Sequence, residues 1–525
     1  MGIGNANMPT SIFCCQCERE SGGTRCGRSG TAGEAPETPA LQDLLIYVLK
    51  DMARFHYRGR DREGVNPAHS QSSTEAGPAT SRGVALGTTD APLQGMVGQG
   101  QWGGPVGDGT RLGAGAAGLM ELLLYGLKGT AAYAHRARTL GREAEEIDIF
   151  LERALDTLAS GHQEDWELLA LCLECGKANL RAMEILHRAQ TAAFGQPEPT
   201  QVRITPVIGK AILVSGHDLS CLEELLQQTA ERGIHVYTHG ELLPAHGYPA
   251  LKRHPHLVGN FGGAWRDQQH EFTHFPGAIL MTTNCVLEPA ASYRDRMFTA
   301  DVVSWPGVPH IQNRNFSPLI QAAMASPGFL ESGPDQTVTV GYSHEDVLAL
   351  VPQLVGAIRS GCIRRLFLIG GCDGAKAGRK YYTRLARIVP QDCAILTLAC
   401  GRCRFNKVDF GTIGGVPRLL DIGQCNDAYS ATRIMLALSE ALECDINELP
   451  VSIVLSWHEQ EAIAMLLSML HLGLKDIRLG PGSPACVSPA IRNALNERFD
   501  IRPITSPEQD LEELLLHTPD LALDS

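Results

Sequence analysis

Two patterns of hydrophobic positions divide the chain. Between residues 118 and 195, apolar residues recur three and four positions apart, which is the spacing of amphipathic helices. The pattern predicts helices over 118–137, 145–159 and 165–189, and these suit an antiparallel bundle. Residues 41–56 show the same helical spacing.

From about Pro206 onward, short apolar runs alternate with turns and helical segments, which is typical of a parallel sheet. We expect one strand to end near Ser215. The capping-box residues Ser220 and Glu223 are expected to start a helix that Gly233 ends. A second stretch of this kind runs from about 331 to the end, with strands expected near 365–369, 394–398, 417–421, 451–455 and 476–479.

Residues 57–115 interrupt these patterns. They are rich in Gly, Ser, Thr and Pro and have almost no periodic apolar face, so they predict a linker or a poorly ordered insertion. The run from Gly113 to Gly118 matches a dinucleotide-binding fingerprint in letters only, because no strand precedes it.

Length, charge and cysteine content narrow the class of protein. A chain of 525 residues should divide into roughly three domains, which we expect at 1–195, 196–330 and 331–525. The net charge of −13 argues against nucleic acid as the main partner. No apolar stretch is long enough to span a bilayer, and the first residues resemble no signal or transit peptide. We therefore expect a cytoplasmic protein with no membrane partner, whose 16 cysteines serve metal or redox chemistry.

Seven apolar runs between residues 211 and 460 are each followed, within a few positions, by a side chain that can bind a metal. The seven side chains are those of His217, Glu241, Cys285, Cys372, Cys400, Cys425 and Glu459. In open α/β sheets, ligand sites gather where the chain leaves the carboxyl ends of the strands. The sequence therefore predicts one metal centre built from many loops.

The mixture of donors indicates the type of centre. Four thiolates, one imidazole and two carboxylates exceed the four ligands of a structural zinc site or of a plain four-iron cubane. Thiolate favours sulfide-bound iron and carboxylate favours oxygen-bound iron, so a cluster with both kinds would use the whole set and keep an open iron position. Each residue also has an ordinary structural interpretation, with Glu241 as a helix cap, His217 bonded to nearby backbone and Cys425 in the core.

Further cysteines form two smaller groups. Cys14, Cys17 and Cys26 lie near the start of the chain and predict an iron–sulfur cluster close to the surface, with zinc as the competing interpretation. Cys172 and Cys175 form a C-x2-C pair, but they lie within a predicted helix among leucines, so we expect them to be buried packing residues.

The chain resembles the hybrid cluster protein family, also called prismane proteins or hydroxylamine reductases. The resemblance covers about 13–56 and 116–525 and rests on the motifs FCCQC, LQDLLIYVLK, YGLKGTAAY, SGHDL, YTHGELLPAHGYP, TTNC, GGCDG, RFNK, DIGQCNDAYS and SWHEQEA. It implies a helical N-terminal domain followed by two Rossmann-like, parallel-sheet α/β domains. It also implies a hybrid iron–sulfur–oxygen cluster where the three domains meet.

The resemblance assigns roles to individual residues. The seven side chains at the strand ends match the family's cluster ligands, and Cys372 matches the cysteine that can carry an extra sulfur as a persulfide. Cys14, Cys17 and Cys26 match three of the four ligands of the family's N-terminal cluster, and Cys403 is expected to neighbour the site without being a ligand. The implied activity is reduction of hydroxylamine to ammonia, or of nitric oxide. The electrons would come from an external reductase, because the chain has no convincing nicotinamide or flavin fingerprint.

Three departures from the family pattern change what is expected. Ala32 replaces the fourth N-terminal cysteine, so the second cluster is expected to be labile, altered or absent. Glu461 replaces a lysine, which predicts either weaker turnover or proton delivery by a neutral carboxylic acid. The stretch 57–115 replaces a helical bundle that many members have.

Two other functions stay open at this point. The protein could be a regulator that transfers a nitrosyl group to partner thiols in the response to nitrosative stress. It could also be a degenerate member with weak catalysis, which Ala32 and Glu461 make plausible.

Overall fold

The computed structural model of the chain describes residues 114–160, 164–283, 285–370, 380–405, 407–456, 460–480 and 489–516. The predictions for 41–56, for nearly all of 57–115, and for Cys14, Cys17, Cys26 and Ala32 lie outside these residues. Residues 114–118, the described part of the glycine-rich run, form the start of a helix.

The three predicted helices are present as α3 (Ala114–Thr139), α4 (Glu145–Ser160) and α5 (Asp165–Phe194). Their directions alternate along the chain, as predicted for an antiparallel bundle. The Cys172 thiol lies 3.6 Å from the Leu119 carbonyl, and Thr130 donates to Asn179 at 3.3 Å. The paired positions advance in the same direction, so α3 and α5 are parallel. Between them in sequence, α4 runs antiparallel to α5, with ion pairs Glu146–Arg181 and Arg153–Glu174.

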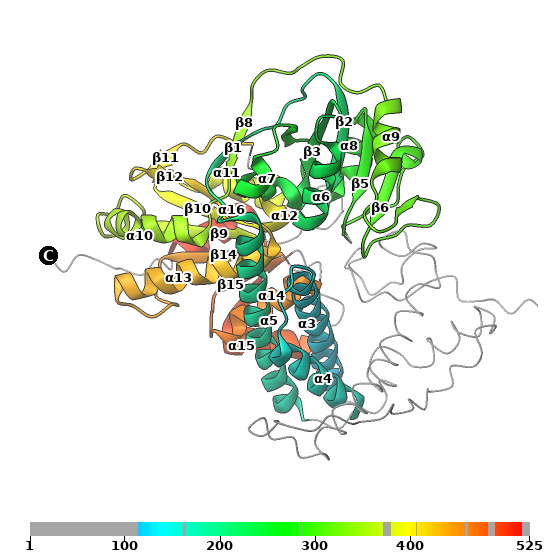
Figure 1. Cartoon of the computed structure of the whole chain (residues 1–525). Coiled ribbons are helices and arrows are strands. Elements are labelled where there is room, and N and C mark those ends of the chain that lie inside the picture. The colour runs from blue at the N-terminus through cyan, green and yellow to red at the C-terminus, as the bar shows by residue number, and fades with distance from the viewer. Residues whose placement is uncertain are drawn as a thin grey trace, which may run out of the picture.

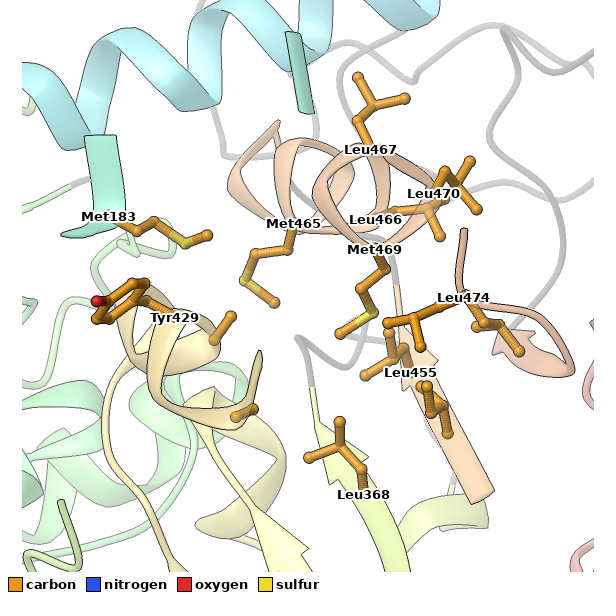
Figure 2. Close-up of a cluster of buried hydrophobic side chains, with 14 of the residues drawn as sticks. Met183, Leu368, Tyr429, Leu455, Met465, Leu466, Leu467, Met469, Leu470 and Leu474 are labelled. Carbon is orange, nitrogen blue, oxygen red and sulfur yellow. The ribbon is translucent and has the colours of Figure 1, made fainter. Parts of the chain in front are cut away.

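A second antiparallel neighbour of α3 comes from much later in the chain. It is α14 (Gln460–His471), whose residues 462–470 are all buried. A helix that is apolar all round needs partners on every side. Figure 2 shows its side chains projecting toward Met183 of α5, Tyr429 of α13 (Ala428–Leu442) and Leu368 and Leu455 of two strands. Gly129 and Gly176 let α3 and α5 approach α14, since an added Cβ would lie 2.6 Å from the Gln460 carbonyl oxygen and 2.0 Å from that of Leu467, respectively.

The cysteine pair on α5 is buried, as predicted. Cys172 and Cys175 are both 0% exposed. Burial raises the pKa of the Cys175 thiol to about 12, although a hydrogen bond with Thr130 opposes the shift. A neutral thiol in an apolar surrounding acts as a small hydrophobic side chain.

The first α/β segment contains a six-stranded parallel sheet in the order β4-β3-β2-β5-β6-β7. Its strands are β2 (Lys210–Ser215), β3 (Ile234–His239), β4 (Leu257–Asn260), β5 (Ala278–Met281), β6 (Met297–Ala300) and β7 (His310–Ile311). Its helices are α6 (Leu219–Thr229), α7 (Pro249–Lys252), α8 (Gln268–His274) and α9 (Ser317–Ala325), and the short 3-10 helix η1 spans Gly240–Gly247.

The second α/β segment contains another six-stranded parallel sheet, in the order β13-β10-β9-β14-β15-β16. Its strands are β9 (Arg365–Gly370), β10 (Cys393–Thr397), β13 (Leu419–Asp421), β14 (Val451–Ser456), β15 (Ile477–Gly480) and β16 (Ile501–Pro503). Around it lie α10 (His344–Arg359), α11 (Tyr381–Ile388), α12 (Ala399–Arg402), α13, α15 (Pro489–Phe499) and α16 (Pro507–Leu516), together with η4 (Cys425–Asp427).

Both sheets have the strand order of a Rossmann fold. Numbered within its own sheet, each order is 3-2-1-4-5-6, and the chain changes direction between strands 1 and 4. The multidomain α and α/β prediction is therefore confirmed. Figure 1 shows the helices α3, α4, α5 and α14 beneath the two sheets. An antiparallel pair, β1 (Thr200–Arg203) with β8 (Thr337–Val340), joins the two α/β segments. The domain boundaries at 195 and 330 stay a prediction.

The N-cap of α6 differs from the predicted one. The start of α6 was predicted at Ser220, but its N-cap is Asp218, whose carboxylate accepts hydrogen bonds from the backbone N–H groups of Ser220 and Cys221. An aspartate forms this cap as well as serine does, and it lies two residues closer to the strand end.

Among the described helices, none is both long enough and apolar enough to cross a membrane.

Candidate metal centre

The seven predicted ligands follow seven strands of the two sheets. The strands are β2, β3 and β5 in the first sheet and β9, β10, β13 and β14 in the second. They include strands 1 and 4 of both sheets, where the chain direction reverses. The structure describes His217, Glu241, Cys285, Cys400 and Cys425, whereas Cys372 and Glu459 lie outside the described residues.

Three of these side chains meet at one point. The Glu241 carboxylate oxygen Oε2 lies 3.9 Å from His217 Nε2 and 3.4 Å from the Cys425 thiol, which donates to it. The backbone N–H of Cys425 donates to the same oxygen at 3.1 Å. His217 and Glu241 belong to the first sheet and Cys425 to the second, so the point of contact lies between the two α/β segments.

The loop after β2 sets the orientation of His217. Gly216 has φ +129°, and a Cβ there would lie 2.2 Å from Thr282 Oγ1, so the close approach of the two loops requires glycine. Thr283 Oγ1 is hydrogen-bonded to His217 Nδ1 at 2.7 Å. This bond leaves Nε2 facing Glu241 and fixes the ring, as a hydrogen bond at the second nitrogen does for metal-bound histidines.

Gln424 ties the loops of the two sheets together. Its side-chain amide donates to the carbonyl of His217 at 3.2 Å and to that of Glu241 at 2.8 Å. It precedes Cys425 directly, so these two bonds set the position of the thiol relative to the other two ligands.

Cys400 is buried near this point, and its thiol adds to the effect of burial, which raises the pKa of Glu241. It lies in the single turn α12, directly after Ala399, whose φ is +60°. A non-glycine residue in this region costs of the order of 1 kcal/mol. The strain lies next to a predicted ligand, which is a common place for it.

Arg402 places a positive charge close to the Glu241 carboxylate. Its side chain is fully buried, its Nη1 lies 3.9 Å from Glu241 Oε1, and its Nε lies 3.3 Å from Asp421 Oδ2. It also donates to the carbonyls of Gly240 and Gly423. Burial raises the pKa of Asp421 to about 6, although Arg402 opposes the shift.

Cys285 and Cys403 lie beside this group. Cys285 is buried on the loop after β5, two residues beyond Thr283, and its carbonyl accepts a hydrogen bond from Gln268 at 2.6 Å. The Cys403 thiol points to the carbonyl of Gly240 at 3.7 Å, and burial raises its pKa. Cys403 therefore neighbours the group through backbone.

The ionisation of these residues fits a cation at the centre. Burial lowers the pKa of His217 and keeps its imidazole neutral, which is the form that binds metals. Burial raises the pKa of Glu241 well above its usual range, and its Oε1 has no hydrogen-bond partner among the described residues. A buried carboxylate of this kind is costly unless a cation compensates it. Together with the thiols, it forms a donor set that suits an iron–sulfur centre.

Glu461 lies near the group but is already paired. On the first turn of α14, its Oε1 accepts a hydrogen bond from Arg136 of α3 at 3.0 Å. Both side chains are largely buried, at 13% and 15% exposure. The position that carries a lysine in the resembling family thus holds the anion of an ion pair whose cation comes from another helix.

Sequence reasoning missed three residues that shape the site, namely Arg136, Arg402 and Gln424. Arg402 had a detectable signal, since it lies between Cys400 and Cys403 at a strand end. Gln424 precedes a predicted ligand directly. Arg136 had none, because its contact with Glu461 spans 325 positions in sequence.

Comparison with known proteins places these features in a family. The profile of the Prismane/CO dehydrogenase family matches residues 12–512. A protein of Geobacter metallireducens named "Hydroxylamine reductase" is 44% identical over 548 residues, covering 96% of this chain and 99% of the relative. Proteins of the same name from Burkholderia lata and Acidiphilium cryptum are each 46% identical, over 95% and 96% of this chain and 98% and 99% of the relatives.

Solved structures agree on the fold. Carbon monoxide dehydrogenase IV from Carboxydothermus hydrogenoformans has a TM-score of 0.60 at 15% identity, covering 98% of this chain and 94% of the other. The Ni-free carbon monoxide dehydrogenase from Thermococcus sp. AM4 has a TM-score of 0.59 at 18% identity, with 96% and 91% covered. Since the profile match spans nearly the whole chain and the relatives align over almost their full length, the chain belongs to the Prismane/CO dehydrogenase family.

Proposed function

We propose that the protein is a cytoplasmic iron–sulfur oxidoreductase that reduces hydroxylamine to ammonia at a hybrid iron–sulfur–oxygen cluster. The ligands would be His217, Glu241, Cys285, Cys372, Cys400, Cys425 and Glu459. The observation that carries the proposal is the meeting of His217, Glu241 and Cys425 from the strand ends of two sheets. The name "Hydroxylamine reductase" of relatives that align over almost their full length supports the choice of substrate.

The proposed reaction is a two-electron, two-proton reduction that needs an electron donor. The N–O bond of hydroxylamine breaks, the molecule takes up two electrons and two protons, and it leaves as ammonia and water. The electrons would come from an external reductase. A bound cluster would supply the electrons at the site and an iron position that accepts the substrate.

The chain's own residues would hold and insulate this chemistry. The five described ligands are at most 5% exposed, so they exclude bulk water from the site. Thr283 holds the tautomer and direction of His217, and Gln424 holds the two ligand loops at a fixed separation. Arg402 offsets part of the negative charge that the carboxylate and thiolates bring together.

An N-terminal cluster held by Cys14, Cys17 and Cys26 is part of the proposal. It would carry electrons toward the buried centre. With Ala32 in place of a fourth cysteine, we propose that it is labile, and a full, air-stable complement of iron and sulfide for two clusters would contradict this.

Weak catalysis is the second candidate, and one observation favours it. The family's lysine would supply a cation at position 461. Here the position holds Glu461, whose carboxylate is paired with Arg136, so it supplies none. We also propose nitric oxide as a substrate of the same centre. A nitrosyl-transfer role would need specific partner proteins.

The test is anaerobic metal and turnover analysis with matched cysteine variants. The purified protein is assayed for iron and sulfide, for its electron paramagnetic resonance signals, and for ammonia formed from hydroxylamine with reduced methyl viologen. We expect Cys425→Ser and Glu241→Gln to lose iron and turnover, while Cys362→Ser, an exposed cysteine, keeps both.

The possible results separate the candidates. Full iron occupancy with turnover near background would favour weak catalysis. A folded protein without iron, or a Cys425→Ser variant with unchanged iron content, would overturn the proposed function.

A further inference from the structure

A second group of metal-binding side chains lies outside the candidate centre. His187 on α5 and His344 and Glu345 at the start of α10 each bring one possible ligand atom within 4.8 Å of the others. Among the described residues, only this group and the His217–Glu241–Cys425 group bring three such side chains that close. Two imidazoles and one carboxylate are a donor set that binds first-row transition metals.

The distances between the donor atoms suit a metal ion. Glu345 Oε1 lies 3.1 Å from His344 Nε2 and 3.7 Å from His187 Nε2. Two ligands at tetrahedral angles on Zn²⁺, with bonds of 2.0–2.1 Å, are about 3.3 Å apart. The observed separations bracket that value, so small side-chain movements complete the geometry.

The other nitrogen of each histidine faces a polar group. His344 Nδ1 is hydrogen-bonded to Ser430 Oγ at 3.1 Å. His187 Nδ1 lies 3.8 Å from Asp427 Oδ1, is buried, and has no hydrogen-bond partner among the described residues. Metal-bound histidines usually donate their second N–H to a carboxylate or hydroxyl in this way. Both rings are therefore turned with Nε2 toward Glu345.

Glu345 is fixed and yet open to solvent. Its second oxygen, Oε2, accepts a hydrogen bond from Gln196 at 2.6 Å, which leaves Oε1 facing the two histidines. The Glu345 side chain is 47% exposed, whereas those of His187 and His344 are 6% and 8% exposed. The site thus has two buried ligands and an entry path past the third.

The surroundings of His187 stabilise a positive charge. Burial would lower the pKa of His187, but the nearby carboxylates of Asp427 and Glu345 outweigh it and raise this pKa to about 9. Two carboxylates around a buried imidazole create a demand for one cation, and a proton or a metal ion can meet it.

We propose that His187 Nε2, His344 Nε2 and Glu345 Oε1 bind a divalent transition-metal ion of the Zn²⁺ class, at a site separate from the candidate cluster. This ion would join α5 to α10. Through Asp427, which lies in the 3-10 turn that begins at Cys425, it would also steady one ligand loop of the main centre. The inference does not depend on the proposed function, because none of its three ligands belongs to the cluster set.

A surface motif must be separated from this site in any test. His270, Glu271 and His274 on α8 form the pattern H-E-x-x-H, and the two imidazole rings lie 4.6 Å apart. Both histidines are exposed, Glu271 is bound to His239 at 2.9 Å, and this set has no third ligand atom close enough among the described residues. Such a pair binds zinc weakly at most, and it serves as the control.

The experiment measures zinc binding to the anaerobically purified holoenzyme. Equilibrium dialysis against Zn²⁺ alone gives the number of bound ions and the dissociation constant for the parent, Glu345→Gln, His344→Gln, Ser430→Ala and His270→Gln. X-ray absorption at the zinc edge then identifies the ligands, because Zn–N and Zn–O bonds of 2.0–2.1 Å differ from Zn–S bonds of 2.3 Å.

We expect one tight zinc ion with nitrogen and oxygen ligands in the parent and in His270→Gln. Glu345→Gln and His344→Gln should weaken its binding at least about 100-fold, and Ser430→Ala, which removes only a partner of a ligand, about 10-fold. Equal zinc binding in the parent and in Glu345→Gln would overturn the inference. So would binding that disappears in His270→Gln, or a zinc spectrum dominated by sulfur.

Discussion

At the scale of single residues, the Arg136–Glu461 ion pair has the most direct consequence for function. It joins α3 to α14, two positions in sequence after the predicted ligand Glu459, and both side chains are largely buried. A lysine at position 461 would face Arg136 instead of pairing with it. The arginine and the glutamate therefore depend on each other.

We predict that Glu461→Lys destabilises the protein by about 2–4 kcal/mol, because it leaves two cations facing each other in a poorly hydrated place. The double variant Arg136→Glu with Glu461→Lys restores the pair with reversed charges and should recover at least half of the loss. Denaturant unfolding measures both. The exposed pair Arg138–Asp148, at 45% exposure on each side, provides the control, since Arg138→Gln should cost less than about 1 kcal/mol.

The same variants also test the role of Glu461 in turnover. If hydroxylamine reduction is the same in Glu461→Lys as in the parent, Glu461 has no part in the mechanism.

A buried histidine makes the stability depend on pH. His246 of η1 is 5% exposed and is hydrogen-bonded to Thr238 at 3.0 Å, and burial lowers its pKa from 6.5 to about 4. The folded state holds this imidazole neutral while the unfolded chain takes up a proton. Its contribution is therefore complete above pH 6.5 and is lost as the pH falls toward 4.

We predict that this single group removes about 2 kcal/mol of stability between pH 7 and pH 5. The loss over this interval should be smaller by that amount in His246→Gln, as measured by denaturant midpoints at the two values. A variant at the exposed His270 should follow the parent. An identical pH dependence in His246→Gln and the parent would contradict the prediction.

At the scale of elements, Gly129 and Gly176 allow α3 and α5 to pack closely against α14. The backbone of α5 at Gly176 is so close to α14 that a Cβ would lie 2.0 Å from the Leu467 carbonyl oxygen and 2.9 Å from the Ser468 nitrogen. Backbone atoms cannot move away as a side chain can, so a methyl group there must separate the helices.

We predict that Gly176→Ala costs at least about 3 kcal/mol and lowers the iron content, because α14 begins directly after Glu459. The matched control is Gly356→Ala on α10, where a Cβ meets nothing within 4 Å. That change should stabilise the protein by about 0.5–1 kcal/mol. Thermal unfolding and iron analysis of the two variants check this, and equal behaviour would refute it.

The strands were predictable and the packing of the helices was not. Runs such as 366–369 and 453–455 are continuous and apolar, and this local pattern is what a strand buried on both faces requires. Both α3 and α5 pack against α14, a helix that begins more than 260 positions after α5 ends. No local pattern reports such a contact.

The same distinction holds for the candidate site. His217, Glu241 and Cys425 could be selected because each follows a strand, and strand ends are visible in sequence. The pairing of Arg402 with Asp421 and the clamp formed by Gln424 could not be selected, because they depend on how the loops of two sheets face each other. The cap of α6 at Asp218 was missed for a local reason, since the two polar residues on either side of Leu219, Asp218 and Ser220, could both fill the role.

At the scale of the whole molecule, the two sheets are held together at the point where the ligands meet. A cluster bound there would cross-link segments that are otherwise joined by the β1–β8 ribbon and by helix packing. Binding energy that exists only in the folded state adds to stability.

We predict that removing iron lowers the melting temperature by roughly 5–10 °C. The loss should be smaller in Glu241→Gln, whose cluster is already weakly bound, and unchanged in the exposed variant Glu440→Gln. Calorimetry of the iron-loaded and iron-free forms gives the comparison. Equal melting temperatures with and without iron would show that no ligand set spans the two segments.

The clamp formed by Gln424 has a consequence for how the protein is made. Its amide reaches carbonyls that lie 207 and 183 positions earlier in the chain. The ribosome therefore synthesises His217 and Glu241 long before Gln424, the residue that fixes their spacing, emerges. The prosthetic group is best inserted after translation, into a nearly finished polypeptide, and truncated nascent chains should not retain it.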